Sequence, residues 1–147
     1  MPSIMRRINA ISRCQGIYRT EMLKTQELSA NHMSFILTIS ANPGSSQEQI
    51  AKRLCLNKST VTRTLSYLEE VGYADRKISE ADKRVTLVYP TQKMLSILPL
   101  VKAASREWNS LICEGISDED LEVFMRVLES LERRAKELTN NTEEREI

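Results

Sequence analysis

Small hydroxyl side chains and one arginine recur at helical spacing between residues 58 and 68. The polar positions on one side of this segment are Ser59, Thr62, Arg63 and Ser66. The apolar residues Val61, Leu65 and Leu68 lie at i, i+4 and i+7, so the pattern predicts a helix with these three residues buried and the polar set facing outward. Hydroxyl and guanidinium groups suit base edges and phosphates, and arginine can bind guanine through two hydrogen bonds. The chemistry indicated is contact with a nucleic acid.

Residues that precede this row have the chemistry of phosphate contacts. Lys58 and Thr60 lie in the first turn of the same predicted helix, where free backbone N–H groups and the helix dipole attract anions. Ser46 and Gln47 open the helix before it and are expected to contact phosphate in the same way. The predicted contacts thus begin at the N-termini of two successive helices.

A further cationic position lies in the polar segment 79–84. Arg84, next to Lys83, is suited to the minor groove of a duplex, where negative potential attracts cations. Asp82 is expected to hold the Arg84 guanidinium in a fixed orientation through a charged hydrogen bond. Taken alone, this segment also fits an ordinary soluble turn, so its meaning depends on the elements around it.

The elements that must position these side chains follow one another in a recognisable order. The predicted helices are residues 4–24, a second helix capped by Ser29, a short helix opened by the capping box Ser46-x-x-Gln49, and a helix capped by Asn57 that ends at Gly72. Residues 73–78 and 85–89 are rich in β-forming side chains and predict two strands. A short helix, a tight turn, an amphipathic helix and a hairpin make a winged helix-turn-helix.

Two more helices are expected after the hairpin. Thr91 caps a helix that runs to about residue 113, and Pro99 inside it is expected to bend it. The last helix opens at Ser117 and carries apolar residues at steps of three and four, which is the spacing of a coiled-coil seam. The seam residues are Leu121, Phe124, Leu128, Leu131, Ala135 and Leu138. Together with the apolar stripes of the first and fifth helices, this surface exceeds what one small lobe can cover and predicts a homodimer.

Composition sets the fold class as mainly α with a small two-stranded β wing. The 147 residues include only 4 Gly and 4 Pro, which argues against a turn-rich β fold. The predicted regions are an N-terminal dimerisation helix (1–28), a winged helix-turn-helix lobe (29–90), C-terminal dimerisation helices (91–138) and a disordered tail (139–147). Charge is uneven: residues 114–147 hold 11 acidic and 5 basic residues, whereas residues 1–113 hold 16 basic and 9 acidic ones. The basic excess is compatible with a polyanionic partner.

The same composition weighs against other classes of protein. No apolar run approaches the length of a membrane span, no signal peptide is evident, and Cys14, Cys55 and Cys113 are spaced like free thiols, so a cytoplasmic protein without a membrane partner is expected. One histidine, no phosphate loop and no metal-ligand spacing predict neither an enzyme nor a cofactor or metal site. The alternative function is a winged-helix protein-interaction module that has lost DNA binding.

Residues 28–91 resemble the MarR family of bacterial regulators. The resemblance rests on residues 46–54, on residues 56–63, on Leu68-Glu69-Glu70-x-Gly72-Tyr73, and on Asp82-x-Arg84 followed by Val85-Thr86-Leu87. It implies a dimer formed by the N- and C-terminal helices that binds a pseudo-palindromic operator, usually as a repressor relieved by a ligand or by oxidation. Ser29 and His32 depart from the family's usual residues at the start of the second helix, and Pro90-Thr91-Gln92-Lys93-Met94 lacks its glycine.

Four residues are weaker candidates for sensing an effector or an oxidant. Cys14, one turn from Tyr18, is either a redox sensor or, the favoured interpretation, a buried small apolar residue. His32 is either a ligand- or pH-responsive residue or, as we favour, a polar residue at a helix start. Tyr18 and Phe35 are interpreted mainly as core residues, with a small-molecule pocket as the alternative. Cys55 is expected to fill core in the helix-turn-helix connection.

Overall fold

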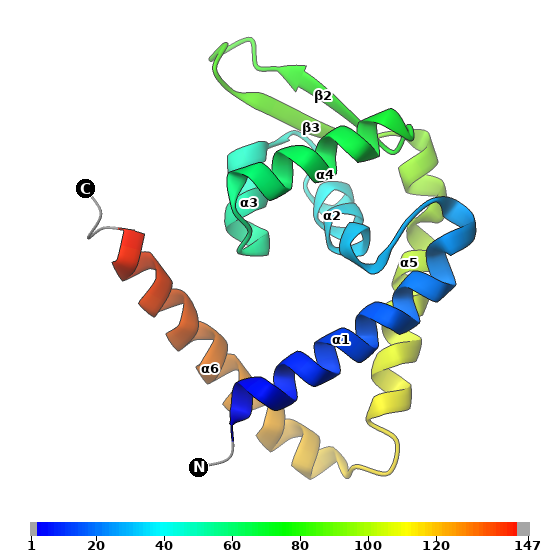
Figure 1. Cartoon of the computed structure of the whole chain (residues 1–147), viewed down its shortest axis with the longest axis vertical. Coiled ribbons are helices and arrows are strands. Elements are labelled where there is room, and N and C mark those ends of the chain that lie inside the picture. Colours follow the sequence, from blue (N-terminus) through cyan, green and yellow to red (C-terminus); the bar gives the residue numbers. More distant parts are fainter. Residues whose placement is uncertain (1–2, 144–147) are drawn as a thin grey trace. The chain divides into compact units, whose positions relative to one another are not determined.

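Figure 1 shows the computed structural model, which describes residues 3–143 and their side chains as far as residue 139. Over this part of the chain, helices dominate and the strands are short. The elements are α1 (Ile4–Leu23), the 3-10 turn η1 (Lys24–Gln26), α2 (Ala30–Ala41), β1 (Ser45–Ser46), α3 (Gln47–Leu54), α4 (Lys58–Glu70), β2 (Ala74–Ile78), β3 (Thr86–Pro90), α5 (Gln92–Ile112) and α6 (Asp118–Glu143).

The chain divides into two compact units, one that ends at Trp108 and one that begins at Asn109. The first unit contains α1 to α4, the sheet and most of α5 around one apolar core. Its largest fully buried side chains come from every one of these elements and include Leu23, Phe35, Ile50, Leu65, Tyr73, Val88 and Met94. Helix α4 contributes Val61, Leu65 and Leu68, as its spacing predicts. The polar side of α4 is therefore turned outward by the burial of the apolar side.

The sheet has one strand more than the sequence predicts. Its order is β1-β3-β2, and both pairs are antiparallel. The added strand β1 is only two residues long, with Ser45 opposite Val88 and Ser46 opposite Leu87. Two serines carry no alternating pattern, so no sequence signal marks this strand. The strand fixes the start of α3 against the hairpin.

Local capping determines where the helices of the first unit begin. The Ser46 hydroxyl accepts the Gln49 N–H at 3.1 Å and the Gln49 side-chain oxygen accepts the Ser46 N–H at 2.9 Å, which confirms the predicted capping box. Asn57 Oδ1 accepts the Thr60 N–H at 2.8 Å and so caps α4. In α2, His32 has the role that Gln49 has in α3: its Nδ1 accepts the Ser29 N–H at 3.0 Å. The interpretation of His32 as a polar residue at a helix start is confirmed.

Two predictions about cysteines are wrong. Cys55 is exposed rather than in the core, because it adopts a left-handed conformation (φ 53°) that ends α3 and directs its side chain outward. Cys14 is also exposed in the single chain, because the half-buried side of α1 is formed by its neighbours Gln15, Tyr18 and Arg19. Phe35, in contrast, is buried in the core of the first unit, as favoured.

The second unit consists of the end of α5, a short connection and α6. The Ser117 hydroxyl accepts the Asp120 N–H at 3.2 Å and starts the helix. Helix α6 continues to Glu143, past the expected end at residue 138, because no glycine or proline interrupts it; residues 144–147 of the predicted tail lie outside the described residues. Among residues 118–139 no side chain is buried, and Phe124 is 55% exposed and Leu138 71% exposed.

Helix α5 was expected to bend at Pro99, and it continues through this residue without a break. Within residues 3–143, no helix combines the length and the apolar character that crossing a membrane requires.

Candidate nucleic-acid interface

Three elements of the first unit meet around one surface hollow. The N-termini of α3 and α4 form two sides and the outer part of the hairpin, from Arg84 to the start of β3, forms the third, with a volume of about 250 Å³. The lining residues are Ser46, Gln47, Glu48, Lys58, Val61, Thr62, Arg84, Val85 and Thr86. Five of the predicted contact residues, Ser46, Gln47, Lys58, Thr62 and Arg84, are thus brought together from segments almost 40 residues apart in the chain.

Two helix N-termini make this hollow favourable for an anion. Unpaired backbone N–H groups and the positive ends of two helix dipoles lie next to it. Lys58 lies 3.8 Å from Glu48, measured between Nζ and Oε1, and both side chains are largely exposed. An exposed ion pair of this length contributes little, so the Lys58 ammonium can exchange its carboxylate partner for a phosphate.

The remaining predicted residues lie outside the hollow. Ser59, Arg63 and Ser66 of α4 and Lys83 of the hairpin are exposed, and Thr60 is half-buried. Two of the hydroxyls make local hydrogen bonds: Ser59 Oγ donates to Asn57 Oδ1 at 2.9 Å, and Ser66 Oγ donates to the Thr62 carbonyl at 2.9 Å. Within α4, Arg63 therefore has the long exposed side chain best suited to reach a base edge.

At the tip of the hairpin, Asp82 binds Arg84 through three hydrogen bonds. Asp82 Oδ1 accepts the Arg84 backbone N–H at 3.0 Å and Nε at 3.1 Å, and Oδ2 accepts Nη2 at 3.0 Å. The side-chain hydrogen bond from Arg84 lowers the pKa of Asp82, and the same bond raises the pKa of Arg84. The expected fixing of Arg84 by Asp82 is present, and the guanidinium remains exposed.

A partly exposed link at the base of the hairpin was not predicted from the sequence. Arg76 of β2 binds Glu69 of α4, with Nη2 at 2.7 Å and Nε at 3.1 Å from Oε2. Arg76 Nη1 also lies 3.4 Å from Gln47 Oε1, and Gln47 Nε2 lies 3.4 Å from Thr62 Oγ1. The hydrogen bond from Arg76 lowers the pKa of Glu69. No spacing rule identifies these pairs, because they join different elements.

The candidate sensing residues lie in separate surroundings. Tyr18 packs against Trp108 with ring centroids 5.3 Å apart, and burial followed by the charge of Glu107 raises the pKa of Tyr18. His32 stacks on Tyr67 of α4 at 4.9 Å, and burial lowers the pKa of His32.

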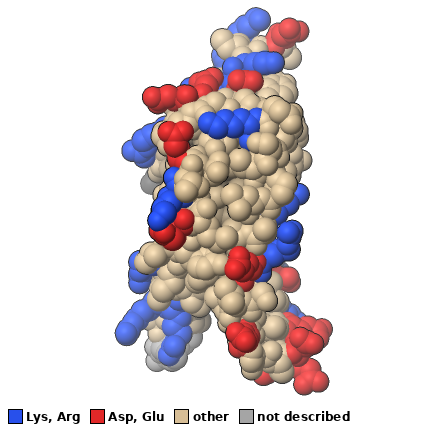
Figure 2. Space-filling model, turned by 90° about the vertical axis from the view of Figure 1, so that its right-hand side faces the viewer, with Lys and Arg blue, Asp and Glu red and all other residues tan. Residues whose placement is uncertain are grey.

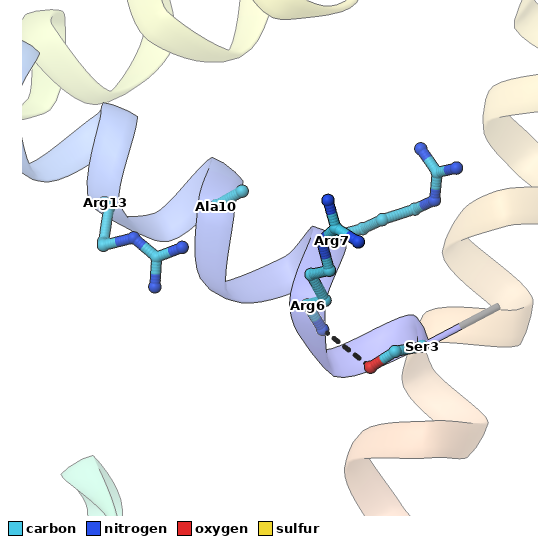
Figure 3. Close-up of a pocket in the computed structure, with 5 residues that line it drawn as sticks. All are labelled: Ser3, Arg6, Arg7, Ala10 and Arg13. Carbon is cyan, nitrogen blue, oxygen red and sulfur yellow. Dashed lines mark hydrogen bonds between the residues drawn. The ribbon is translucent and has the colours of Figure 1, made fainter.

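A larger hollow, of about 560 Å³, lies along the start of α1 (Figure 3). Three arginines line it, but their guanidinium groups fan out along the helix rather than converge on one point. The lining residues are Ser3, Arg6, Arg7, Ala10 and Arg13. None of them belongs to the predicted contact set. Among residues whose side chains are described, no group of three or more His, Cys, Asp or Glu side chains is placed to hold a metal ion.

Comparison with known proteins agrees with the winged helix-turn-helix geometry described above. Residues 28–86 match the MarR family. The HTH-type transcriptional regulator YybA of Bacillus subtilis is 24% identical over 128 residues, which covers 87% of this chain and 85% of that protein. A MarR protein from Peptoclostridium difficile superposes with a TM-score of 0.90 at 25% identity, covering 93% of this chain and 90% of the other. Streptococcus pneumoniae FabT, solved in complex with DNA, superposes with a TM-score of 0.77 at 28% identity, covering 92% and 96%.

These likenesses follow the elements described above. The matched residues begin just before α2, pass through α3, α4 and β2, and end at the first residue of β3, so they contain the helix-turn-helix and the hairpin as far as the start of its second strand. The structural likeness extends over more than nine-tenths of the chain and so includes the terminal helices. The winged helix-turn-helix region of this chain, within residues 28–86, therefore matches the MarR family, and the chain shares the fold of the MarR protein described above.

Proposed function

We propose that the chain is a dimeric, cytoplasmic regulator of transcription that binds double-stranded DNA through α4 and the hairpin. The observation that carries the proposal is the hollow shared by the N-termini of α3 and α4 and by Arg84. It presents two helix N-termini and two cations on one surface, which suits a duplex backbone. FabT, a structural relative, has been solved with DNA bound.

Each predicted residue has a role in this proposal. Arg63 reads base edges in the major groove, with Ser59, Thr62 and Ser66 beside it. Lys58, Thr60, Ser46 and Gln47 bind phosphates, and Arg84, oriented by Asp82 and flanked by Lys83, enters the minor groove. Two-fold symmetry in a dimer would place two copies of α4 in successive major grooves, so the operator is expected to be pseudo-palindromic. We propose repression as the regulatory mode.

The alternative, a protein-interaction module without DNA binding, is less well supported. Such a module would replace the cations of the recognition face and hairpin with acidic or apolar residues. Lys58, Arg63, Lys83 and Arg84 are all exposed here. Selection of bound sequences from a random DNA pool tests this alternative directly, because a protein-interaction module would enrich no DNA.

The test of the proposed contacts compares two kinds of substitution on the selected operator. Arg63→Ala should cost about 1–3 kcal/mol on the operator and relax base preference, whereas Lys58→Ala should weaken binding to all sequences and reduce the salt slope by about 1. Fluorescence anisotropy at several salt concentrations measures both. Equal loss on operator and random DNA for Arg63→Ala would refute base recognition by Arg63.

Lys102→Ala is the matched control for the loss of one positive charge. Lys102 is exposed on α5, outside the proposed interface. Figure 2 shows the side of the molecule on which α5 lies in Figure 1, and cationic and acidic side chains both border a broad neutral area there. Lys102→Ala should leave both affinity and salt slope unchanged.

A further inference from the structure

Arg76 lies where the hairpin leaves the core of the first unit. Its strand partner Val88 is fully buried, whereas Ile78, two residues farther out on β2, is 64% exposed. Beyond Lys77 and its partner Leu87, the last residue paired with β1, the hairpin is a two-stranded ribbon, and such ribbons have little rigidity of their own. The angle between the ribbon and α4 must therefore be determined near its base.

The contacts of Arg76 join the hairpin to both helices of the helix-turn-helix. Its guanidinium donates two hydrogen bonds to Glu69 Oε2 of α4, at 2.7 and 3.1 Å, and its backbone N–H lies 3.4 Å from Glu69 Oε1. The Arg76 side chain is 21% exposed and the Glu69 side chain is 40% exposed. A charge-assisted pair that is partly shielded from water is stronger and more directional than an exposed one.

The same guanidinium determines how Gln47 faces the hollow. Arg76 Nη1 donates to Gln47 Oε1 at 3.4 Å, and Gln47 Nε2 donates to Thr62 Oγ1 at 3.4 Å. One lone pair of Oε1 is directed at Arg76 and one Nε2 hydrogen at Thr62, so the amide has one N–H left to donate to a ligand. Reading adenine through two hydrogen bonds requires the oxygen as well. Gln47 held in this way is a donor to phosphate oxygens or to base acceptors.

We propose that Arg76, held by Glu69, is a positioning residue for DNA binding. It fixes the hairpin that carries Arg84 relative to α4, and it orients Gln47 as a hydrogen-bond donor toward the DNA. This inference rests on the proposed function, and it adds two residues, Arg76 and Glu69, that touch no DNA themselves.

The substitution Glu69→Gln provides a test, because two explanations of the role of Glu69 predict opposite changes in DNA affinity. If Glu69 acted only through its charge, its neutralisation near DNA would strengthen binding. If Glu69 holds Arg76, the substitution weakens the pair and should weaken operator binding by about three- to tenfold, within the range of couplings in contacting networks. Glu70→Gln is the matched control: Glu70 is the next residue on α4, is exposed, and has no ion pair in the described structure.

A double-mutant cycle with Arg84→Ala separates positioning from general loss of stability. In the wild-type background Arg84→Ala removes the minor-groove contact, and in the Glu69→Gln background the contact is already misplaced. We expect the loss of operator affinity caused by Arg84→Ala to be at least about twofold smaller in the Glu69→Gln background than in the wild-type background. Circular dichroism and size-exclusion chromatography verify that Glu69→Gln remains folded and in the wild-type oligomeric state.

Three results would overturn the inference. The Arg76–Glu69 pair does not position the hairpin if the Glu69→Gln variant binds the operator as tightly as the Glu70→Gln variant. The same conclusion follows if the losses of affinity in the double-mutant cycle are additive. The proposed function would survive both of these outcomes, because wild-type binding is measured in the same experiment. A wild-type protein that binds no DNA would overturn both proposals together.

Discussion

Helices α4 and α6 share an apolar spacing, but their side chains end in different surroundings. Val61, Leu65 and Leu68 of α4 are buried in the core of the first unit. The seam of α6 has the same steps of three and four, yet Phe124, Leu131 and Leu138 are all exposed in the single chain. The pattern of α4 is satisfied within the chain. The pattern of α6 requires apolar surface from elsewhere, and a second copy of the chain supplies it in the proposed dimer.

The largest effect that follows from this comparison concerns α4. Leu65→Ala should destabilise the first unit by about 2–5 kcal/mol, because it leaves a cavity in a packed core. Denaturant unfolding followed by circular dichroism measures the change. Ser66→Ala, at the exposed neighbouring position, should stay within about 0.5 kcal/mol of wild type. A small loss for Leu65→Ala would mean that the core is less tightly packed than its burial indicates.

The corresponding substitution in α6 should act on association rather than on folding of the first unit. Phe124→Glu is expected to weaken dimerisation by about 2 kcal/mol or more, as for a central apolar residue of an interface. Sedimentation equilibrium at several protein concentrations gives the dissociation constant. Val123→Glu, the preceding exposed apolar residue outside the seam, should change it much less. Equal effects would argue against the seam as the contact.

The helix caps allow a second comparison of α4 with α6, because each of these two helices begins with one capping side chain. Asn57→Ala removes the acceptor of the Thr60 N–H in α4, and Ser117→Ala removes the acceptor of the Asp120 N–H in α6. Each should cost about 1 kcal/mol. Asn57→Ala should also weaken DNA binding, since it loosens the first turn of α4. Ser117→Ala should reduce the stability of α6 while leaving affinity per dimer unchanged, and a shared effect on affinity would contradict this separation.

The smallest expected effect is a pH dependence confined to the first unit. Burial lowers the pKa of His32 in the folded protein, so the unfolded chain binds a proton more readily. The stabilisation is present above the unfolded pKa of about 6.5 and is lost as the pH falls through the lower folded pKa. Protonation also removes the Nδ1 lone pair that accepts the Ser29 N–H.

His32→Gln tests the assignment of this dependence. Glutamine accepts the N-cap N–H without titrating in this range, as Gln49 does for Ser46. The difference in unfolding free energy between wild type and His32→Gln should therefore change between pH 7.5 and pH 5 and favour the variant at the lower pH. Parallel stability curves would show that His32 contributes no pH dependence.

Local rules in the sequence determined most of the elements. The spacing of Val61, Leu65 and Leu68, the capping box at Ser46 and the cap at Asn57 each involve residues within two turns of one another. Such signals can be recognised without the rest of the chain, because helix geometry and capping hydrogen bonds are local. The same signals predicted the order of a winged helix-turn-helix and the pairing of Asp82 with Arg84.

Only the tertiary structure decided which distant groups meet. The link from Arg76 to Glu69 and Gln47 depends on where a packed core places α3, α4 and β2, and strand β1 exists because Ser45 lies opposite Val88. Exposure of Cys55 likewise depends on the left-handed turn at its own residue. Each of these features depends on the direction the chain takes after a turn and on the packing between elements. The spacing of residues along the sequence carries no information about either.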